Sequence, residues 1–542
     1  MKAADLFVKS LESSDVKYVF GVPGEENLAF VEALRNSSIE LVTTRDEQTA
    51  VFMAATVGRL TGRVGVALST LGPGATNLVT GVAYAQLGGM PLLVITGQKP
   101  IKKSKQGKFQ IIDVVGMMKP ITKMAETIVS ADRIPSTVYQ AVRTAEKERP
   151  GAVHLEFPED IAEETSENEP IEWKKLRRPV PDQKSIDTVV KVVEKAKKPI
   201  IVIANGANRK LIHKQLGNFL DKTKIPFVTT QMGKGVEDES SELFIGTTAL
   251  SDGDYVHQAI AAADLVIMIG HDITEKPPVL NHKSIVHINF YSADIDAVYT
   301  PLVEVIGDIS NALWAMSEQI TPQEHWDFAE FITQKKKLAA DIENNSDSET
   351  SPIKPQRFVK ELREVVPKDG ILSLDNGMYK IWIARNYPAY LQNTVLLDNA
   401  LATMGAGLPV GMAAKLLNPE KKVVVIAGDG GFMMNLADLE TAKRLKLDLV
   451  VVVLNDQGYG MIKWKQEDMG FADFGLSFTN PDFVKLAESF GAKGYKITEA
   501  AQLKPVLEHV INAPGIHILD VPIDYSENTE LIASNLVKRT KE

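Results

Sequence analysis

Residues 428–460 of the chain read GDGGFMMNLADLETAKRLKLDLVVVVLNDQGYG. The run LVVVVL at 449–454, like VVVIA at 423–427, is apolar throughout, which is typical of strands covered on both faces of a parallel sheet. The residues between the two runs have a helix-like pattern, so the stretch predicts a strand–helix–strand unit. Parallel strands end at the same edge of a sheet, where α/β folds bind their ligands. We therefore expect Asp429 and Asp456, which follow the two strands, to lie side by side.

The same alternation of short apolar runs and helical patterns fills most of the 542-residue chain. Two polar, charged stretches that carry proline interrupt it at 164–185 and 341–355, and we interpret them as linkers. The predicted fold class is α/β, with three consecutive doubly wound parallel-sheet domains at 1–162, 185–335 and 355–542. The runs that we interpret as strands are VKYVFGVPG, VGVALST, MPLLVITG and AVHLEFP in the first domain, KKPIIVIANGAN, IPFVTT, ADLVIMIGHD and SIVHINF in the second, and ILSLDNG, KVVVIAGDGG, LDLVVVVLND and IHILDVPID in the third.

Composition argues against several classes of protein. The net charge of -10, without a large basic block, argues against nucleic acid or an anionic membrane as the main partner. The chain has no cysteine, which excludes disulfides, thiolate metal sites and cysteine nucleophiles. The N-terminal residues lack the unbroken apolar core of a signal peptide, and no uninterrupted apolar run reaches about 18 residues, so we expect no membrane span. These observations predict a cytoplasmic enzyme.

Hard oxygen ligands and glycines come together in the 428–460 stretch. Mg²⁺ prefers carboxylate oxygens, with phosphate oxygens completing its octahedral shell. Gly430 and Gly431 can present backbone N–H groups to a phosphate at a helix start, and Gly458 and Gly460 allow close backbone approach, so that a carbonyl there could be a third metal ligand. The stretch therefore predicts a Mg²⁺-diphosphate site. The alternative is that these residues serve only the turns at the strand ends.

The triplet Gly-Asp-Gly, followed after 24 residues by an Asn-Asp pair, resembles the cofactor motif of thiamine-diphosphate (ThDP) enzymes. The family usually has Asn-Asn there, and an aspartate in the second place adds negative charge that should hold Mg²⁺ at least as well. The resemblance implies three metal ligands, namely Asp429, Asp456 and the main-chain carbonyl of Gly458. It also implies a set of cofactor-binding residues around the diphosphate: Gly428, Gly430, Gly431, Tyr459, Gly460 and Met461.

Two further segments resemble the parts of the family that hold the thiamine rings. In LVTTRDEQTAVFMAATVGRL, Glu47 stands where the family places the acid that bonds N1′ of the pyrimidine and so activates the cofactor. In DNALATMGAGLPVGMAA, Met404 matches the apolar residue that bends the cofactor, and the Ala402 carbonyl and Met404 amide would bond the pyrimidine edge. Without the resemblance, Glu47 is an ordinary acid at a helix start and Met404 a core side chain. The segment DNGMYKIW matches the family's other diphosphate-contacting turn, with Gly377, Met378 and Tyr379.

Nearly the whole chain resembles the acetolactate synthase group of this family. The segments that carry the likeness are GVPGEENL, STLGPGATNL, GQKPIKKSKQGKFQIIDVVGMMKPITK and ERPGAVHLEFPEDI. In that group the loop with Phe109 and Gln110 lines the substrate cavity, and the turn at Gly24 and Glu25 faces the cofactor ring. The resemblance thus adds Phe109, Gln110 and Gly24 to Glu47 as candidate catalytic residues. The alternative makes Phe109 a core residue and Gln110 a surface residue.

The chain resembles the catabolic, FAD-independent type of this group. The Arg-Phe-Asp-Asp-Arg segment of the FAD-containing biosynthetic type is absent, and ADLVIMIGHDITEKPPVLN stands in its place. We therefore expect ThDP and Mg²⁺ as cofactors, and no FAD. Where the biosynthetic type has a tryptophan that favours 2-ketobutyrate as acceptor, this chain has Lys465, with Trp464 one place earlier. A cation there could bind a substrate carboxylate or point to solvent, so the acceptor stays open.

The resemblance implies that pyruvate is decarboxylated and condensed with a second pyruvate to give 2-acetolactate and CO₂. It implies 2-keto acids as partners, and a homodimer or homotetramer with sites between chains. Pyruvate decarboxylases use adjacent histidines, and none of the nine histidines here are adjacent; glyoxylate carboligase lacks the catalytic glutamate, which is present as Glu47. The alternatives are a related ThDP-dependent decarboxylase or carboligase with another acceptor, a pyruvate-oxidase-like enzyme with tight FAD, and a non-catalytic nucleotide-binding protein with Mg²⁺ at the Gly-Asp-Gly site. No P-loop motif is present to support the last of these.

Overall fold

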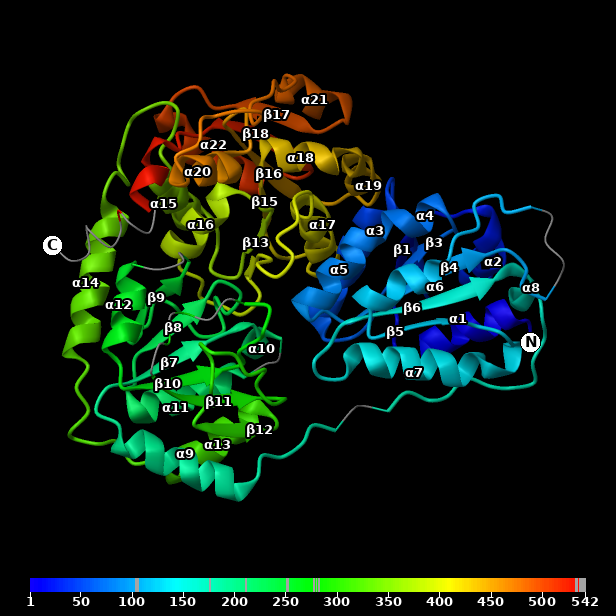
Figure 1. The fold of residues 1–542 in the computed structure, drawn as a ribbon. Helices are drawn as coiled ribbons and strands as arrows, with labels where there is room; N and C mark the ends of the chain where they lie inside the picture. The colour runs from blue at the N-terminus through cyan, green and yellow to red at the C-terminus, as the bar shows by residue number, and fades with distance from the viewer. Residues whose placement is uncertain are drawn as a thin grey trace. The chain divides into compact units, whose positions relative to one another are not determined.

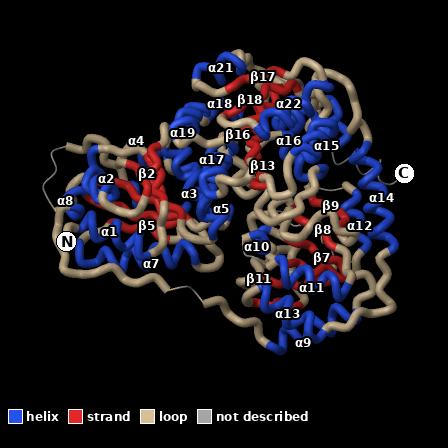
Figure 2. The backbone as a smooth tube through the Cα atoms, turned by 180° about the vertical axis from the view of Figure 1, so that it is seen from behind, coloured by secondary structure: helices blue, strands red, loops and turns tan. Residues whose placement is uncertain are grey.

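The computed structural model describes residues 1–102, 107–174, 177–209, 212–249, 253–275, 278, 280, 283–531 and 535. These residues form three six-stranded sheets, in which all strand pairings are parallel. Helices alternate with the strands in each of them (Figures 1 and 2). The chain divides into two compact units, which we call the first unit (1–177, 400–419 and 435–447) and the second unit (178–399, 420–434 and 448–542).

The first unit contains the first sheet, with strand order β2-β1-β3-β4-β6-β5. Its strands are β1 (Tyr18–Gly21), β2 (Glu40–Thr43), β3 (Gly65–Ser69), β4 (Leu92–Gln98), β5 (Met124–Thr127) and β6 (Ala152–Pro158). Its helices are α1 (Ala3–Ser13), α2 (Leu28–Arg35), α3 (Glu47–Thr61), α4 (Pro73–Asn77), α5 (Val79–Gly88), α6 (Val114–Met118), α7 (Ile134–Glu146) and α8 (Glu159–Ala162). Helix α1 packs against α7, and α3 packs against α5.

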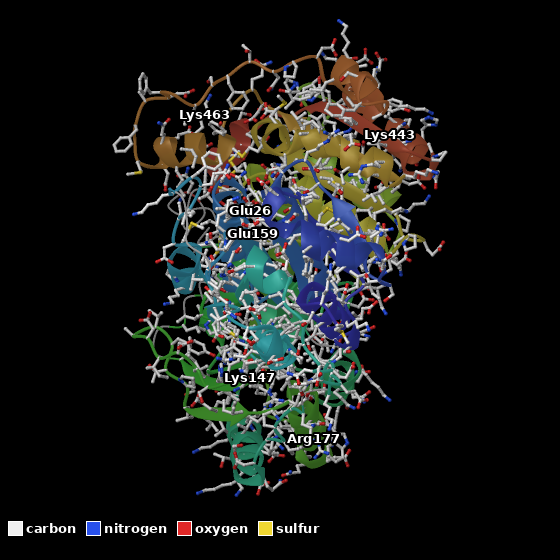
Figure 3. All side chains as sticks on the ribbon, turned by 90° about the vertical axis from the view of Figure 1, so that its right-hand side faces the viewer. Glu26, Lys147, Glu159, Arg177, Lys443 and Lys463 are labelled. Carbon is white, nitrogen blue, oxygen red and sulfur yellow. The ribbon has the colours of Figure 1, made fainter. Side chains whose placement is uncertain are left out.

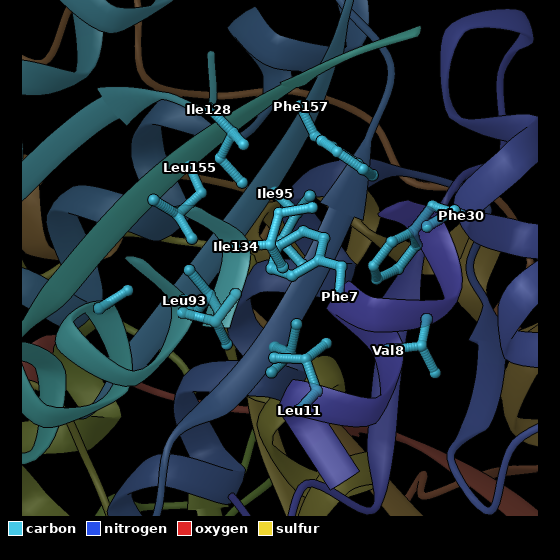
Figure 4. Packing of buried hydrophobic residues seen from close by; sticks show 14 of the residues in the cluster. Phe7, Val8, Leu11, Phe30, Leu93, Ile95, Ile128, Ile134, Leu155 and Phe157 are labelled. Atoms are coloured by element: carbon cyan, nitrogen blue, oxygen red, sulfur yellow. The ribbon is translucent and has the colours of Figure 1, made fainter. Parts of the chain in front are cut away.

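Aromatic and branched side chains from α1, α2, α7 and the sheet form the core of this unit (Figure 4). The ring of Phe7 lies 5.2 Å from that of Phe30 and 5.1 Å from that of Phe157, in edge-to-face contact. Edge-to-face pairs contribute about 0.5–1.5 kcal/mol each beyond the area that they bury. Strands β4 and β6 are buried along their whole length.

Two later segments of the chain belong to the first unit. They carry α17 (Gly407–Leu417) and α19 (Leu439–Arg444), and α17 packs against α3. The backbone amide of Arg45 donates to Asp438 Oδ1 at 2.8 Å, and the Asn435 side-chain amide donates to the Gly405 carbonyl at 2.8 Å. Parts of the predicted third domain, 355–542, therefore pack with the beginning of the chain. The domain boundaries themselves stay a prediction.

The second unit contains the other two sheets. The second sheet has the order β12-β11-β10-β7-β8-β9, which is the 3-2-1-4-5-6 order of doubly wound folds read in reverse. Its strands are β7 (Pro199–Ile203), β8 (Phe227–Thr230), β9 (Phe244–Thr248), β10 (Leu265–Ile269), β11 (Ser284–Asn289) and β12 (Val303–Ile306). Its helices are α9 (Gln183–Lys195), α10 (Asn205–Asn208), α11 (His213–Thr223), α12 (Tyr255–Ala262), α13 (Ile309–Gln319) and α14 (Ala329–Glu343).

The third sheet has the order β14-β13-β15-β16-β18-β17. Its strands are β13 (Ile371–Leu374), β14 (Val395–Leu396), β15 (Val423–Gly428), β16 (Leu449–Asn455), β17 (Lys493–Lys496) and β18 (Ile516–Pro522). Its helices in this unit are α15 (Pro355–Val365), α16 (Met378–Asn386), α18 (Asp429–Met434), α20 (Gly460–Asp468), α21 (Phe483–Ser489) and α22 (Leu503–Asn512). Buried Arg385 on α16 joins this sheet to α12 of the second, because its guanidinium donates to Asp254 at 2.9 and 3.0 Å.

The predicted fold class is confirmed, and each predicted strand run contains a strand. The strands outside those runs are the two edges of each sheet: β2 and β5, β12 and β9, and β14 and β17. Edge strands have solvent on one side, so they lack the continuous apolar pattern of interior strands. The second predicted linker begins inside a helix, since α14 extends to Glu343 and Asp341 pairs with Arg385 at 2.6 Å. No helix among the described residues has the length and apolarity to cross a membrane.

Candidate active site

Two acidic side chains meet at the carboxyl edge of the third sheet. Strands β15 and β16 are neighbours, with Gly428 opposite Leu454, so Asp429 and Asp456 follow adjacent strand ends. Asp429 Oδ2 accepts a hydrogen bond at 2.8 Å from the amide of Gln457, the residue after Asp456. The two carboxylates are therefore neighbours, as the sequence predicts, while their role as metal ligands stays a prediction.

The electrostatics of this pair fit a divalent cation. Burial raises the pKa of the Asp429 carboxyl, and burial together with the charge of Asp429 raises the pKa of Asp456 to about 7. Two buried carboxylates repel each other unless a cation lies between them. No group of three acidic or histidine side chains that could hold a metal occurs among the described residues. A third protein ligand would thus be another kind of oxygen, and the main-chain carbonyl of Gly458 stays the predicted one.

Glycines keep the space around the two carboxylates open. A Cβ on Gly460 would lie 2.7 Å from Asp456 Oδ2, and one on Gly431 would lie 2.9 Å from an oxygen of Asp375. A Cβ on Gly428 would lie 3.2 Å from Cε1 of Tyr379, which is at the start of α16. Side chains at these positions would displace Asp456, Asp375 or Tyr379, so the arrangement of this sheet edge depends on glycine.

The predicted turn at Gly377, Met378 and Tyr379 joins the same edge, because it follows β13, the neighbour of β15. Met378 and Tyr379 are buried. The Tyr379 hydroxyl oxygen faces the Gly428 backbone amide, but its hydrogen has no acceptor among the described residues. A buried phenol without an acceptor is unusual, and a bound anion beside it would supply the acceptor. These residues therefore fit a magnesium-bound diphosphate.

Glu47 is the first residue of α3 in the first unit. Asp46 caps this helix by accepting a hydrogen bond from the Gln48 amide at 2.7 Å. The Glu47 side chain is buried, and its Oε2 accepts a hydrogen bond from Asn77 Nδ2 at 3.0 Å. A Cβ on Gly74 would lie 2.9 Å from Glu47 Oε1, so this glycine leaves room for the carboxyl group. The position of Glu47 is thus fixed by the capped start of α3, by the hydrogen bond from the Asn77 side-chain amide and by the close approach of the Gly74 backbone.

Three family models match the chain. They are described as "Thiamine pyrophosphate enzyme, N-terminal TPP binding domain" over residues 1–117, the central domain of the same enzymes over 186–316, and the C-terminal TPP binding domain over 375–521. The chain belongs to the thiamine pyrophosphate enzyme family. Thiamine pyrophosphate is another name for ThDP, so the prediction of a ThDP-dependent enzyme is confirmed. The last match contains both acidic residues and the turn at Gly377.

Acetolactate synthases are among the relatives of this thiamine pyrophosphate enzyme. It is 33% identical to "Acetolactate synthase" of Bacillus subtilis, with 99% of this chain and 96% of the relative covered. It is 32% identical to "Acetolactate synthase, catabolic" of Raoultella terrigena, with 98% and 96% covered. It is 33% identical to "Probable acetolactate synthase large subunit" of Methanocaldococcus jannaschii, with 98% and 93% covered. The predicted likeness to the acetolactate synthase group is confirmed.

The candidate substrate loop of this thiamine pyrophosphate enzyme lies at the surface of the first unit. The Phe109 residue is 76% exposed, so the interpretation of Phe109 as a core residue is wrong. Gln110 is exposed and has a left-handed backbone with φ of 57°. Gly72 lies against it, since a Cβ there would be 2.9 Å from the Gln110 carbonyl oxygen. Gly24 is equally tight, because a Cβ on it would lie 2.5 Å from Cβ of Thr70.

The other predicted ring-contacting residues are in the first unit as well. Ala402 is exposed and has a φ of 55°. Met404 is partly buried and precedes α17, which packs on the helix that Glu47 begins. The predicted pyrimidine contacts of Glu47, Ala402 and Met404 thus come from segments far apart in the chain that one unit brings together. Their contacts with a cofactor stay a prediction.

The predicted residues after Asp456 begin α20. Tyr459 precedes this helix, with its ring 5.0 Å from that of Phe478, and Gly460 and Met461 start it. Trp464 is buried, and its Nε1 donates to the Asn528 carbonyl at 2.8 Å. Lys465 is half-exposed, with Nζ 4.4 Å above the Trp464 ring and 3.5 Å from Asp468. Trp464 therefore packs inside the second unit, and Lys465 is the more accessible of the two substrate candidates.

Sequence reasoning missed Asn480, which binds the carboxylate of Asp429. Its Nδ2 donates to Asp429 Oδ2 at 2.7 Å and to Asn455 Oδ1 at 3.0 Å. The preceding residues pair with the loop after β16, since the Tyr459 amide donates to the Leu476 carbonyl at 3.0 Å. On α20 above this loop, Lys463 (Figure 3) pairs with Asp473 at 2.6 Å. No motif marks Asn480, and only the pairing of the two loops would have revealed it.

Proposed function

We propose that this protein is a ThDP- and Mg²⁺-dependent acetolactate synthase that decarboxylates pyruvate and joins the remaining two carbons to a second pyruvate. The observation that carries the proposal is the similarity to proteins named acetolactate synthase over 98–99% of the chain. The neighbouring carboxylates of Asp429 and Asp456 support it, because they form a site of the kind that a magnesium-bound diphosphate requires.

In the proposed enzyme, Asp429 and Asp456 hold Mg²⁺ with the main-chain carbonyl of Gly458. The amides of Gly430 and Gly431, at the start of α18, would donate to the phosphate oxygens. In the free protein the Gly430 amide donates to Asp429 Oδ1 at 2.8 Å, so it would exchange this partner for the phosphate. The hydrogen bonds from Asn480 and from the Gln457 amide fix the Asp429 carboxylate in the orientation that the metal needs. These residues anchor one end of the cofactor, so that its reactive ring is presented at a fixed place.

ThDP, when bound, supplies a carbon nucleophile and accepts the electron pair that CO₂ leaves behind. Glu47 holds a proton at N1′ of the pyrimidine, which requires a carboxyl group that is buried and fixed. Its burial, the capped start of α3 and the hydrogen bond from Asn77 meet this requirement. Met404 would contact the thiamine rings with its apolar side chain, and the Ala402 carbonyl would accept a hydrogen bond from the pyrimidine.

Phe109 and Met404 contribute apolar surface around the reacting carbon. An apolar surrounding favours loss of the substrate carboxylate, because charge disappears in that step, and it limits protonation by water. Gln110 and Gly24 border this space, and Lys465 is the candidate contact for the acceptor's carboxylate. The exposed Phe109 is consistent with a site that a second chain completes, and we infer a homodimer or homotetramer, as in the enzymes that the chain resembles.

The proposal is tested by incubating the purified protein with pyruvate, ThDP and Mg²⁺, without added FAD, and identifying the product. We expect one molecule of 2-acetolactate and one of CO₂ for every two molecules of pyruvate consumed. We expect no activity when ThDP or Mg²⁺ is omitted. Acetaldehyde as the main product would identify a decarboxylase instead, and an adduct formed only with another keto acid would identify a carboligase with a different acceptor. Activity that required FAD would contradict the FAD-independent type.

A further inference from the structure

Tyr525 reaches the edge of the third sheet that carries the acidic pair. Strands β13, β15, β16 and β18 are consecutive neighbours in this sheet. Beyond their carboxyl ends lie Tyr379, Asp429, Asp456 and Tyr525, in that order. Two phenols and two carboxylates therefore gather at one sheet edge, where Tyr379 and Tyr525 also interact with each other. Tyr525 lies after the last residue of the C-terminal family match, which ends at residue 521.

Tyr525 is close to the candidate metal ligands. Burial, followed by the charges of Asp456 and Asp429, raises the pKa of its phenol. A Cβ on Gly460 would lie 3.5 Å from Cδ2 of Tyr525 and 2.7 Å from Asp456 Oδ2, so the ring and the carboxylate border the same glycine. The ring of Tyr525 thus lies at the start of α20, beside the loop that carries Asp456.

The Tyr525 hydroxyl oxygen is buried and faces the Tyr379 backbone amide, but its hydrogen has no acceptor among the described residues. Other atoms of Tyr525 are partly exposed, so it is the hydroxyl end of the side chain that points into the protein. Buried tyrosine hydroxyls usually find a partner, and leaving one unpaired costs stability. The presence of such an unsatisfied hydroxyl is explained if it gains a hydrogen-bond acceptor when a ligand binds.

We propose that the Tyr525 hydroxyl is a binding group for the magnesium-bound diphosphate and gains its hydrogen-bond acceptor only when that anion is present. The inference rests on the proposed function and adds a residue to its cofactor site. The ligand class is a pyrophosphate ester with Mg²⁺, so inorganic pyrophosphate with Mg²⁺ carries the same recognised group. The phenol is a neutral donor at physiological pH, and it adds no charge to a site already rich in carboxylates.

The test is the variant Tyr525→Phe, which removes one oxygen and keeps the ring. Because the hydroxyl donates to no acceptor in the free protein, we expect the free variant to melt at the same temperature as the wild type. Its affinity for ThDP with Mg²⁺ should fall about tenfold, which corresponds to about 1.4 kcal/mol. A tyrosine that only supports the fold would lower both the melting temperature and the affinity, and that result would overturn the proposal.

Tyr299→Phe is the matched control. The Tyr299 side chain is buried, but its hydroxyl is paired with His287 Nδ1 at 2.7 Å in the second sheet. Its loss should lower the melting temperature and leave cofactor affinity unchanged. Tyr525→Phe should therefore lower the cofactor affinity without lowering the melting temperature, and Tyr299→Phe should lower the melting temperature without lowering the affinity.

Calorimetry with three probes separates the possible origins of the effect: ThDP with Mg²⁺, inorganic pyrophosphate with Mg²⁺, and Mg²⁺ alone. We expect Tyr525→Phe to weaken the first two by similar factors and to leave the third unchanged. Equal affinity of variant and wild type for all probes, or an equal loss with Mg²⁺ alone, would refute the assignment. If the wild type itself bound neither diphosphate, the proposed function would fail before any variant was compared.

Discussion

Gly460→Ala displaces one candidate metal ligand while leaving the fold in place. The added Cβ would lie 2.7 Å from Asp456 Oδ2, whereas ordinary contact begins at 3.4 Å, so the carboxylate must move by at least 0.7 Å. Mg²⁺ requires near-ideal octahedral geometry with oxygen distances of about 2.0–2.1 Å, and plausible sites keep such distances within about 0.2 Å. The displacement is therefore more than three times what the metal tolerates.

The fold should survive this change, because the end of an aspartate side chain can rotate. Gly460 lies outside the left-handed region and begins α20, where alanine favours the helix by about 0.5–1 kcal/mol. We expect the affinity for ThDP with Mg²⁺ to fall at least tenfold, or by about 1.4 kcal/mol, with an unchanged circular dichroism spectrum and the same melting temperature or a higher one.

Calorimetric titration with ThDP at saturating Mg²⁺ measures this loss. Gly217→Ala is the control, because Gly217 lies within α11 and the nearest atom to an added Cβ is a Glu237 oxygen at 3.6 Å. The control should bind like the wild type and melt at the same temperature or higher. A folded Gly460→Ala protein with affinity within twofold of the wild type would refute the reasoning that Asp456 is a ligand in the position seen here.

Three further predictions follow from the described contacts. Glu47→Gln should lower turnover by at least about 10²-fold while ThDP still binds, and near-normal turnover would rule out the assignment. Asn480→Ala removes the 2.7 Å hydrogen bond to Asp429 and should weaken Mg²⁺-dependent ThDP binding about tenfold, whereas unchanged binding would exclude an orienting role. Burial raises the pKa of Glu275 to about 7 from 4.5, so the folded chain holds this proton more tightly than the unfolded chain, and the free energy of unfolding should fall as the pH rises from about 4.5 to about 7. Glu275→Gln should flatten that fall, as measured by melting temperature against pH, and identical profiles would contradict this account.

The interior of each sheet could be predicted from the sequence, and its edges could not. Strands such as β4, β7 and β16 are buried on both faces, which forces a continuous apolar run. No residue of the edge strands β5 and β17 is fully buried, and their sequences MAET and KGYK carry no such run. The apolar pattern of a sequence indicates which strands are buried, so it does not identify a strand that is partly exposed to solvent.

Some residues of the candidate site could likewise be predicted from the sequence, and others could not. Asp429 and Asp456 could be placed together from sequence, because parallel strands end at one edge and both residues follow apolar runs. Asn480 and Tyr525 could not, since each reaches that edge from a loop with no periodic pattern. The grouping of 400–419 and 435–447 with the first unit was equally hidden, because it depends on packing of α17 against α3.

The position of the metal can be located by anomalous diffraction from crystals grown with ThDP and Mn²⁺ in place of Mg²⁺. The account predicts one anomalous peak within bonding distance of a carboxylate oxygen of Asp429, a carboxylate oxygen of Asp456 and the carbonyl oxygen of Gly458, with the diphosphate completing its shell. A peak elsewhere in the chain, or a diphosphate bound away from these residues, would contradict it.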